Sequence, residues 1–286
     1  MTESRSANAT PEPTLVPAAG LILRPAPRPQ ARARLICFPY AGGGAAAWHP
    51  WRALLPTWIE LAMVQLPGRE GRLRERAYTR MESAVEAIVP AVAALDDLPC
   101  VFFGHSMGAL IAFATARALR AADAPTPALL IVSGRRAPNL VDPEPDIHTL
   151  ADGPFVGALI RRYNAIPRVL LEDVELLRLF LPTLRADLEL LETYAYTPAA
   201  PLASPMLALG GDDDSRARLA DLAGWRAQTS GPFHTQQFPG GHFYINTARD
   251  ALIETLVTAI GEAITALPNA GAQPDPGTAP LQRSRT

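Results

Sequence analysis

Lysine is missing from this 286-residue chain, so all 26 of its basic residues are arginines. Charged residues of both signs are scarce, at 19% of the chain, and the formal net charge at pH 7 is −2. A protein that binds nucleic acid or an anionic membrane surface usually carries a clear basic excess, which this chain lacks. We therefore expect neither nucleic acid nor a membrane as a partner.

Cysteine is nearly as rare, because Cys37 and Cys100 are the only 2 in the chain. This number excludes a disulfide framework and a zinc cluster. Both residues lie in apolar runs, where buried core thiols are the simplest interpretation. No run of about 18 apolar residues occurs, and the amino terminus lacks the apolar segment of a signal peptide. We expect a cytoplasmic protein without a metal site.

Both ends of the chain are rich in proline, alanine and polar residues. Residues 1–30 and 268–286 cannot bury enough apolar surface to fold, so we expect flexible tails there. Hydrophobic residues make up 48% of the chain, which is enough for a sizeable core. We therefore expect one α/β domain over residues 31–267.

Short apolar runs alternate with helical patterns along this domain. The runs predict strands at 34–39, 59–66, 100–103, 129–133, 206–209 and, more weakly, 235–238. Apolar residues recur at helical spacing over 81–95, 107–121 and 248–267. Strands that alternate with helices predict a mostly parallel central sheet with helices on both faces.

Residues 138–201 interrupt the alternation. No good strand occurs there, and the segments PFVGALIRRYN and EDVELLRLFLPTLRADLELLETY are instead typical of helices. We expect a helical insertion between two strands, which is a natural lid over an active site.

The strongest chemical signal is Gly-His-Ser-Met-Gly at residues 104–108, which follows a predicted strand and opens a predicted helix. A serine on such a strand-to-helix turn adopts strained backbone angles, and the flanking glycines relieve the crowding. The turn exposes the hydroxyl at the carboxyl edge of the sheet, beside a helix N-terminus that favours negative charge. Ser106 is therefore the candidate nucleophile.

A serine nucleophile needs a base and an acid, which follow it in that fold in the order acid, then histidine. Of the 5 histidines, His242 lies in a glycine-rich loop after the last strand, where the base belongs. His105 lies inside the turn and is expected to pack rather than react. The strand at 206–209 runs into three consecutive acids, Asp212, Asp213 and Asp214, and spacing alone does not decide between them.

An oxyanion hole needs one backbone N–H from the residue after the serine, here Met107, and a second from a loop after an early strand. Residues 39–44, Pro-Tyr-Ala-Gly-Gly-Gly, form that loop. Successive glycines also occur in phosphate loops, but neither GK[ST] nor GxGxxG follows, which excludes a nucleotide site.

Five segments in this order resemble the type II thioesterases: FPYAGGGAAAW, LPGRE, GHSMGA, LPTLRADLELLETY and GGHFYIN. That family consists of stand-alone editing enzymes of polyketide, nonribosomal-peptide and fatty-acid assembly lines. The resemblance covers about residues 33–262 and implies an α/β-hydrolase fold with a helical lid.

The resemblance also implies roles for individual residues. The nucleophile of the family falls on Ser106 and its base on His242. Its pattern of proline, strand, two glycines and aspartate, counted from Pro205, places the acid at Asp214. The oxyanion donors fall on the backbone N–H groups of Ala41 and Met107.

The implied reaction is hydrolysis of acyl thioesters held on the phosphopantetheine arm of acyl or peptidyl carrier protein domains. Such enzymes remove aberrant or stalled acyl groups, bind no cofactor of their own, and are expected here as monomers. The run of Arg69, Arg72, Arg74 and Arg76 either docks an acidic carrier protein or forms a solvated loop with local salt bridges.

Two other functions stay open at this point. A small-molecule esterase, lipase or acyltransferase would use the same triad, because a fold does not fix the substrate. A binding module with a hydrolase fold would not need Ser106, His242 and an acidic loop together, so their presence favours an enzyme.

Overall fold

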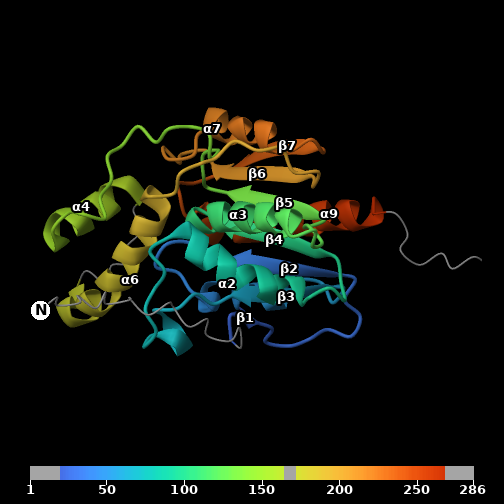
Figure 1. Cartoon of the computed structure of the whole chain (residues 1–286), viewed down its shortest axis with the longest axis horizontal. Coiled ribbons are helices and arrows are strands. Elements are labelled where there is room, and N and C mark those ends of the chain that lie inside the picture. Colours follow the sequence, from blue (N-terminus) through green and yellow to red (C-terminus); the bar gives the residue numbers. More distant parts are fainter. Residues whose placement is uncertain (1–19, 164–171, 268–286) are drawn as a thin grey trace, which may run out of the picture.

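The computed structural model describes residues 20–163 and 172–267, so the predicted tails at 1–19 and 268–286 lie outside the described residues. A seven-stranded sheet forms the centre, with the order β1-β3-β2-β4-β5-β6-β7 (Figure 1). Its strands are β1 (Ile22–Leu23), β2 (Ala33–Phe38), β3 (Ile59–Val64), β4 (Cys100–His105), β5 (Leu129–Ser133), β6 (Met206–Gly211) and β7 (Phe233–Phe238). All pairs are parallel except β1 with β3. The predicted α/β class with a mostly parallel sheet is confirmed.

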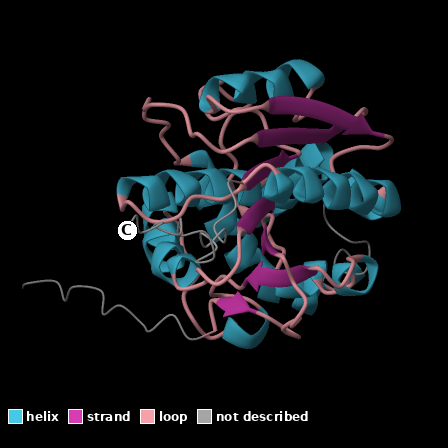
Figure 2. Ribbon diagram, turned by 90° about the vertical axis from the view of Figure 1, so that its right-hand side faces the viewer, coloured by secondary structure: helices cyan, strands magenta, loops and turns pink. Residues whose placement is uncertain are grey.

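Helices cover both faces of this sheet (Figure 2). The α-helices are α1 (Trp51–Leu54), α2 (Met81–Ala93), α3 (Met107–Ala121), α4 (Asp152–Tyr163), α6 (Val174–Glu192), α7 (Leu219–Ala223), α8 (Tyr244–Thr247) and α9 (Arg249–Thr265). Three short 3₁₀ helices are η1 (Ala45–Trp48), η2 (Glu70–Arg72) and η3 (Gly224–Gln228). Apolar residues of α2 and α3 pack on one face, and those of α1 and α9 pack on the other. None of the described helices is both long and apolar enough to cross a membrane.

Burial on both faces explains why the strands read as continuous apolar runs. Every residue of β2, β3, β5 and β6 is buried. Arg34 of β2 and Glu60 of β3 are the buried charged residues in these four strands. The Nε of Arg34 donates to Glu60 Oε1 at 2.6 Å, while its other nitrogens reach Asp97. Of the two cysteines, Cys37 is buried and Cys100 is partly buried, and burial raises the pKa of both thiols.

The predicted N-terminal tail is wrong for residues 20–30. Ile22 and Leu23 pair antiparallel with Val64 and Met63 of β3, and Leu21 is buried. The pattern was missed because two strand residues between prolines are too short to show a period.

Two features of the topology place a crevice at the carboxyl end of the sheet. The first is that β2 lies between β3 and β4, so the chain leaves the neighbouring ends of β2 and β4 in opposite directions. The second is that the insertion between β5 and β6 contributes α4 and α6 beyond those ends, at the left of Figure 1. Residues 164–171 of this insertion lie outside the described residues.

Candidate active site

Ser106 lies on the sharp turn between β4 and α3, with φ of 55° and ψ of −114°. A positive φ is rare for a residue other than glycine, and it marks a backbone held by its surroundings. The surroundings are tight, because a Cβ on Gly104 would lie 2.1 Å from the Gly108 oxygen, and one on Gly108 would lie 2.4 Å from the Phe38 oxygen. The Ser106 N–H donates to the Ser133 carbonyl at 2.7 Å. These contacts fix the serine at the carboxyl edge of the sheet.

A continuous hydrogen-bond chain leads from Ser106 to an acid. His242 Nε2 lies 3.0 Å from Ser106 Oγ, and His242 Nδ1 lies 2.8 Å from Asp214 Oδ2. All three residues are buried. In the neutral ring, an Nδ1–H that donates to the carboxylate leaves Nε2 free to accept the serine proton.

The three consecutive acids after β6 have different surroundings. Asp214 is buried, and its second oxygen, Oδ1, accepts the Arg216 N–H at 2.9 Å. Asp212 and Asp213 are exposed, and Asp212 accepts a backbone N–H of the loop that carries His242. Only Asp214 of the three bonds the histidine, which is the register that the family pattern predicts.

Gly211, the last residue of β6, allows the loop that carries His242 to lie close to this strand. A Cβ on Gly211 would lie 2.2 Å from the Gly240 oxygen and 2.4 Å from the Gly241 oxygen. A glycine at this strand end therefore brings the backbone before His242 against β6, beside the loop that holds Asp214.

The loop after β2, residues 39–44, faces the serine turn across the sheet edge, since Phe38 pairs with Gly104. Gly42 has φ of 75°, and its N–H donates to Asp187 Oδ2 at 2.7 Å. In the part of the chain that the structure describes, the Ala41 N–H has no hydrogen-bond acceptor. Met107 is the first residue of α3, and first-turn N–H groups have no partner inside a helix. Both predicted donors are thus available.

A buried ion pair supports this loop, and no pattern in the sequence predicts it. Arg69 donates from Nη2 to Asp187 Oδ1 at 2.7 Å and from Nη1 to both Asp187 Oδ2 and the Gly43 carbonyl at 2.8 Å. Both side chains are at most 5% exposed. The interpretation of Arg69 as part of a docking or solvated arginine run is therefore wrong, whereas Arg72 does make the local salt bridge, with Glu75.

His105 forms a second set of buried contacts next to His242. Its Nδ1 lies 2.9 Å from Ser133 Oγ, which in turn lies 2.7 Å from the Tyr244 hydroxyl. Complete burial holds the pKa of His105 well below its ordinary value, so the ring is neutral. The ring centroid lies 5.0 Å from that of His242. The packing role expected for His105 fits this environment.

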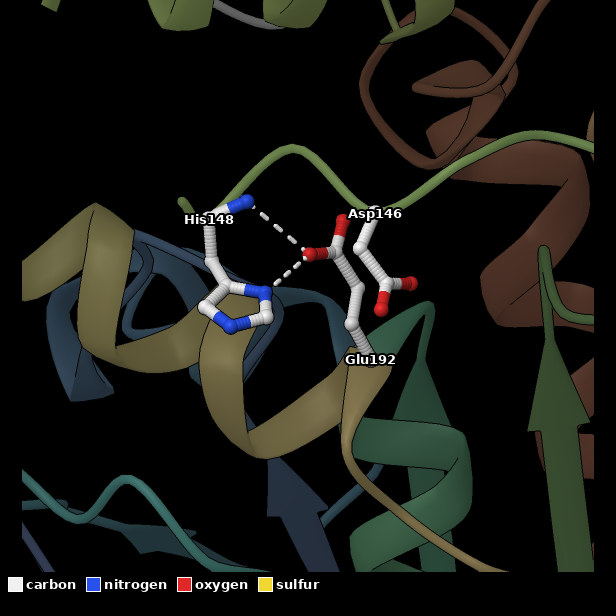
Figure 3. A group of neighbouring side chains, drawn as sticks. All are labelled: Asp146, His148 and Glu192. Carbon is white, nitrogen blue, oxygen red and sulfur yellow. Dashed lines mark hydrogen bonds and ion pairs between the residues drawn. The ribbon is translucent and has the colours of Figure 1, made fainter. Parts of the chain in front are cut away.

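A second cluster of polar side chains lies where the segment before α4 contacts the C-terminal end of α6 (Figure 3). One atom that could bind a metal ion, a carboxylate oxygen or a ring nitrogen, from each of Asp146, His148 and Glu192 lies within 4.8 Å of the other two. Glu192 Oε2 accepts the Ile147 N–H, the His148 N–H and the His148 ring Nδ1 at 2.6–3.0 Å. Because these donors occupy the carboxylate, we interpret Glu192 as an anchor of the loop on α6.

The sequence matches the family described as "Thioesterase domain" over residues 33–260. The chain belongs to this thioesterase family. PikA5, a thioesterase of Streptomyces venezuelae, is 43% identical over 221 residues, which cover 77% of this chain and 78% of PikA5. The gramicidin S biosynthesis protein GrsT of Aneurinibacillus migulanus is 39% identical over 224 residues, covering 78% of this thioesterase and 87% of GrsT.

The fold is similar to solved thioesterases as well. RedJ, from the prodiginine pathway of Streptomyces coelicolor, superimposes with a TM-score of 0.76 at 38% identity, covering 87% of this chain and 96% of RedJ. These similarities confirm the predicted membership of the type II thioesterases and the α/β-hydrolase fold. The protein is thus a thioester hydrolase, and its relatives serve antibiotic, polyketide and nonribosomal-peptide biosynthesis.

Proposed function

We propose that this thioesterase releases acyl groups from the phosphopantetheine arm of acyl or peptidyl carrier domains, using Ser106, His242 and Asp214 as its triad. The observation that carries the proposal is the buried hydrogen-bond chain through these three residues, on a serine turn with positive φ. The pathways in which the relatives act support a carrier-bound substrate and an editing role.

The first half of the reaction transfers the acyl group to the enzyme. His242 Nε2 accepts the hydroxyl proton while Ser106 Oγ attacks the thioester carbonyl carbon. The backbone N–H groups of Ala41 and Met107 donate to the oxyanion that develops. The C–S bond then breaks, and the pantetheine thiol leaves with the proton held by His242.

The second half releases the acid. Water gives a proton to His242 and attacks the acyl-serine carbonyl, again with the oxyanion held by the two N–H groups. Collapse of this intermediate returns the proton to Ser106 Oγ and frees the carboxylic acid. Asp214 keeps the imidazole in the required tautomer and stabilises the imidazolium in both halves. No cofactor enters this scheme.

The test is a panel of carrier proteins loaded with different acyl chains, with hydrolysis followed by intact mass. We expect Ser106→Ala to lose several orders of magnitude in rate and to lose labelling by a fluorophosphonate probe. A variant that keeps more than about a tenth of the wild-type rate would contradict the assignment of the nucleophile. A preference for simple oxygen esters over every carrier thioester would instead favour a small-molecule esterase or acyltransferase.

A further inference from the structure

A cavity of about 350 Å³ lies between the insertion and the carboxyl ends of β5 and β6. The loop after β5, from Arg135 to Asp146, forms one wall, and the C-terminal ends of α4 and α6 form another. Arg216, in the loop after β6, closes the third side. This volume is within the range of small-molecule sites, which starts at about 300 Å³.

The cavity borders the proposed catalytic residues. Tyr163 lines it from α4, and the centroid of its ring lies 5.1 Å from that of His242. Arg216 lines it as well, and its backbone N–H bonds Asp214. A group bound in the cavity would therefore belong to the molecule that reacts at Ser106.

Most charges around the cavity are paired with one another. Arg216 pairs with Asp142 and Glu144, and Arg162 pairs with Glu144 and Glu192. The oxygens of Asp142 are both occupied, one by Arg216 and the other by the Glu144 N–H. These acids are thus already neutralised within the wall.

Arg135 is different, because within residues 20–163 and 172–267 its guanidinium makes no hydrogen bond or ion pair. Its Nε is buried without a partner, as are those of Arg136 and Arg216, but these two arginines form ion pairs through their other nitrogens. Burial also lowers the pKa of the Arg135 guanidinium. A buried donor without an acceptor is costly and calls for a reason. The backbone is well held, since Trp225 Nε1 donates to the Arg135 oxygen at 2.8 Å. Asp146 also lines the cavity, but it is exposed and makes no hydrogen bond or ion pair with the other described residues.

We propose that this cavity is an anion subsite, in which Arg135 binds a negatively charged group of the thioester substrate. The proposal rests on the proposed function, which brings that substrate to Ser106. A guanidinium fork matches a carboxylate or a phosphate and binds either through two parallel hydrogen bonds. Two parts of the substrate have this chemistry: a carboxylate at the end of a short acyl chain, and the phosphate of the pantetheine arm.

Matched substrates distinguish these sources. Succinyl and butyryl thioesters have four-carbon acyl chains that differ in a terminal carboxylate. Each acyl group is tested as a thioester of free pantetheine and of free phosphopantetheine, two thiols that differ only in the phosphate. The variant is Arg135→Gln, and the control is Arg161→Gln, which removes an exposed arginine of α4 that does not line the cavity.

If the acyl carboxylate binds, Arg135→Gln lowers the succinyl-to-butyryl ratio of kcat/KM by about tenfold or more on pantetheine. If the phosphate binds, the same variant lowers the phosphopantetheine-to-pantetheine ratio for the butyryl substrate by a similar factor. Either result supports the subsite, provided that Arg161→Gln leaves both ratios at the wild-type value. Ratios that stay within about twofold of wild type in Arg135→Gln overturn it. A wild-type enzyme that hydrolyses none of the thioesters would instead contradict the proposed function.

Discussion

Asp187 on α6 and Arg69 after β3 form a buried two-point ion pair, with Arg69 Nη2 2.7 Å from Asp187 Oδ1 and Nη1 2.8 Å from Oδ2. The same carboxylate accepts the Gly42 N–H, and the same guanidinium donates to the Gly43 carbonyl. One pair of side chains therefore joins the insertion, the strand end of β3 and the loop that carries the proposed oxyanion donor Ala41.

Breaking this pair is expected to destabilise the protein strongly. Asp187→Asn leaves the buried Arg69 charge without its partner, which typically costs about 3–5 kcal/mol in the free energy of unfolding. The double variant Arg69→Met/Asp187→Leu should lose less than the sum of the two single changes, because no charge is left buried alone. Chemical denaturation of the wild type, Asp187→Asn, Arg69→Met, Asp187→Leu and the double variant measures both effects. A loss below about 1 kcal/mol in Asp187→Asn, the level of a surface pair, would contradict the assigned role.

Asp214, the proposed acid of the triad, has two adjacent aspartates that serve as controls. Asp214→Asn is expected to lower kcat by about three to four orders of magnitude, because an amide at this place favours the wrong imidazole tautomer. Asp212→Asn and Asp213→Asn change exposed side chains and should stay within about threefold of wild type. The measurement is thioester turnover at saturating substrate. Greater sensitivity at Asp212 or Asp213 would show that the register is wrong.

The serine turn should not tolerate a methyl group at Gly108. The added carbon in Gly108→Ala would lie 2.4 Å from the Phe38 oxygen, so the backbone has to shift and the serine hydroxyl moves with it. We expect a loss of at least about a hundredfold in kcat/KM and a lower melting temperature. Gly153→Ala in α4 is the matched control, because no atom lies within 4 Å of the added carbon. It should be neutral or slightly stabilising, and equal behaviour of the two variants would refute the packing argument.

The burial of His105 leads us to expect that the free energy of unfolding depends on pH. Its pKa is lowered in the folded state, so the unfolded chain binds a proton first as the pH falls below about 6.5. The contribution of His105 is therefore complete above that pH and is lost on acidification. Between pH 6.5 and 5, His105→Asn should reduce the slope of unfolding free energy against pH by up to about 1.4 kcal/mol per unit.

The exposed His234→Asn is the control for this slope, which urea denaturation at a series of pH values would measure. Parallel curves for wild type and His105→Asn would rule out a buried neutral ring.

The sequence predicted the parts of the fold that are local. Each parallel strand from β2 to β6 is buried on both faces and therefore appears as an apolar run, whereas the two-residue β1 depends on pairing with distant β3. Ser106 and His242 could be named as candidates from the sequence because the serine turn and the glycine-rich loop are contiguous motifs. The spacing in the sequence does not decide which of the three consecutive aspartates is the candidate acid, and only the family pattern indicates Asp214.

The missed residues depend on tertiary contacts. Arg69 and Asp187 are 118 positions apart, and each belongs to a motif that is recognisable without revealing that the two meet. Arg135 belongs to none of the motifs above, and its proposed role comes from its surroundings: a cavity and the absence of an ion-pair partner among the described residues. Contacts of this kind are set by packing, which a one-dimensional pattern does not record.

The Asp187 link also limits how substrate can enter. To swing the carboxyl half of α6 away from the sheet, the protein would have to separate Asp187 from both Arg69 and Gly42. A cost of about 3 kcal/mol would keep such an open form below about 1% of molecules. The hinge for admitting substrate should therefore lie before that half of the helix, and the loop with the proposed oxyanion donor Ala41 would keep its shape throughout the catalytic cycle.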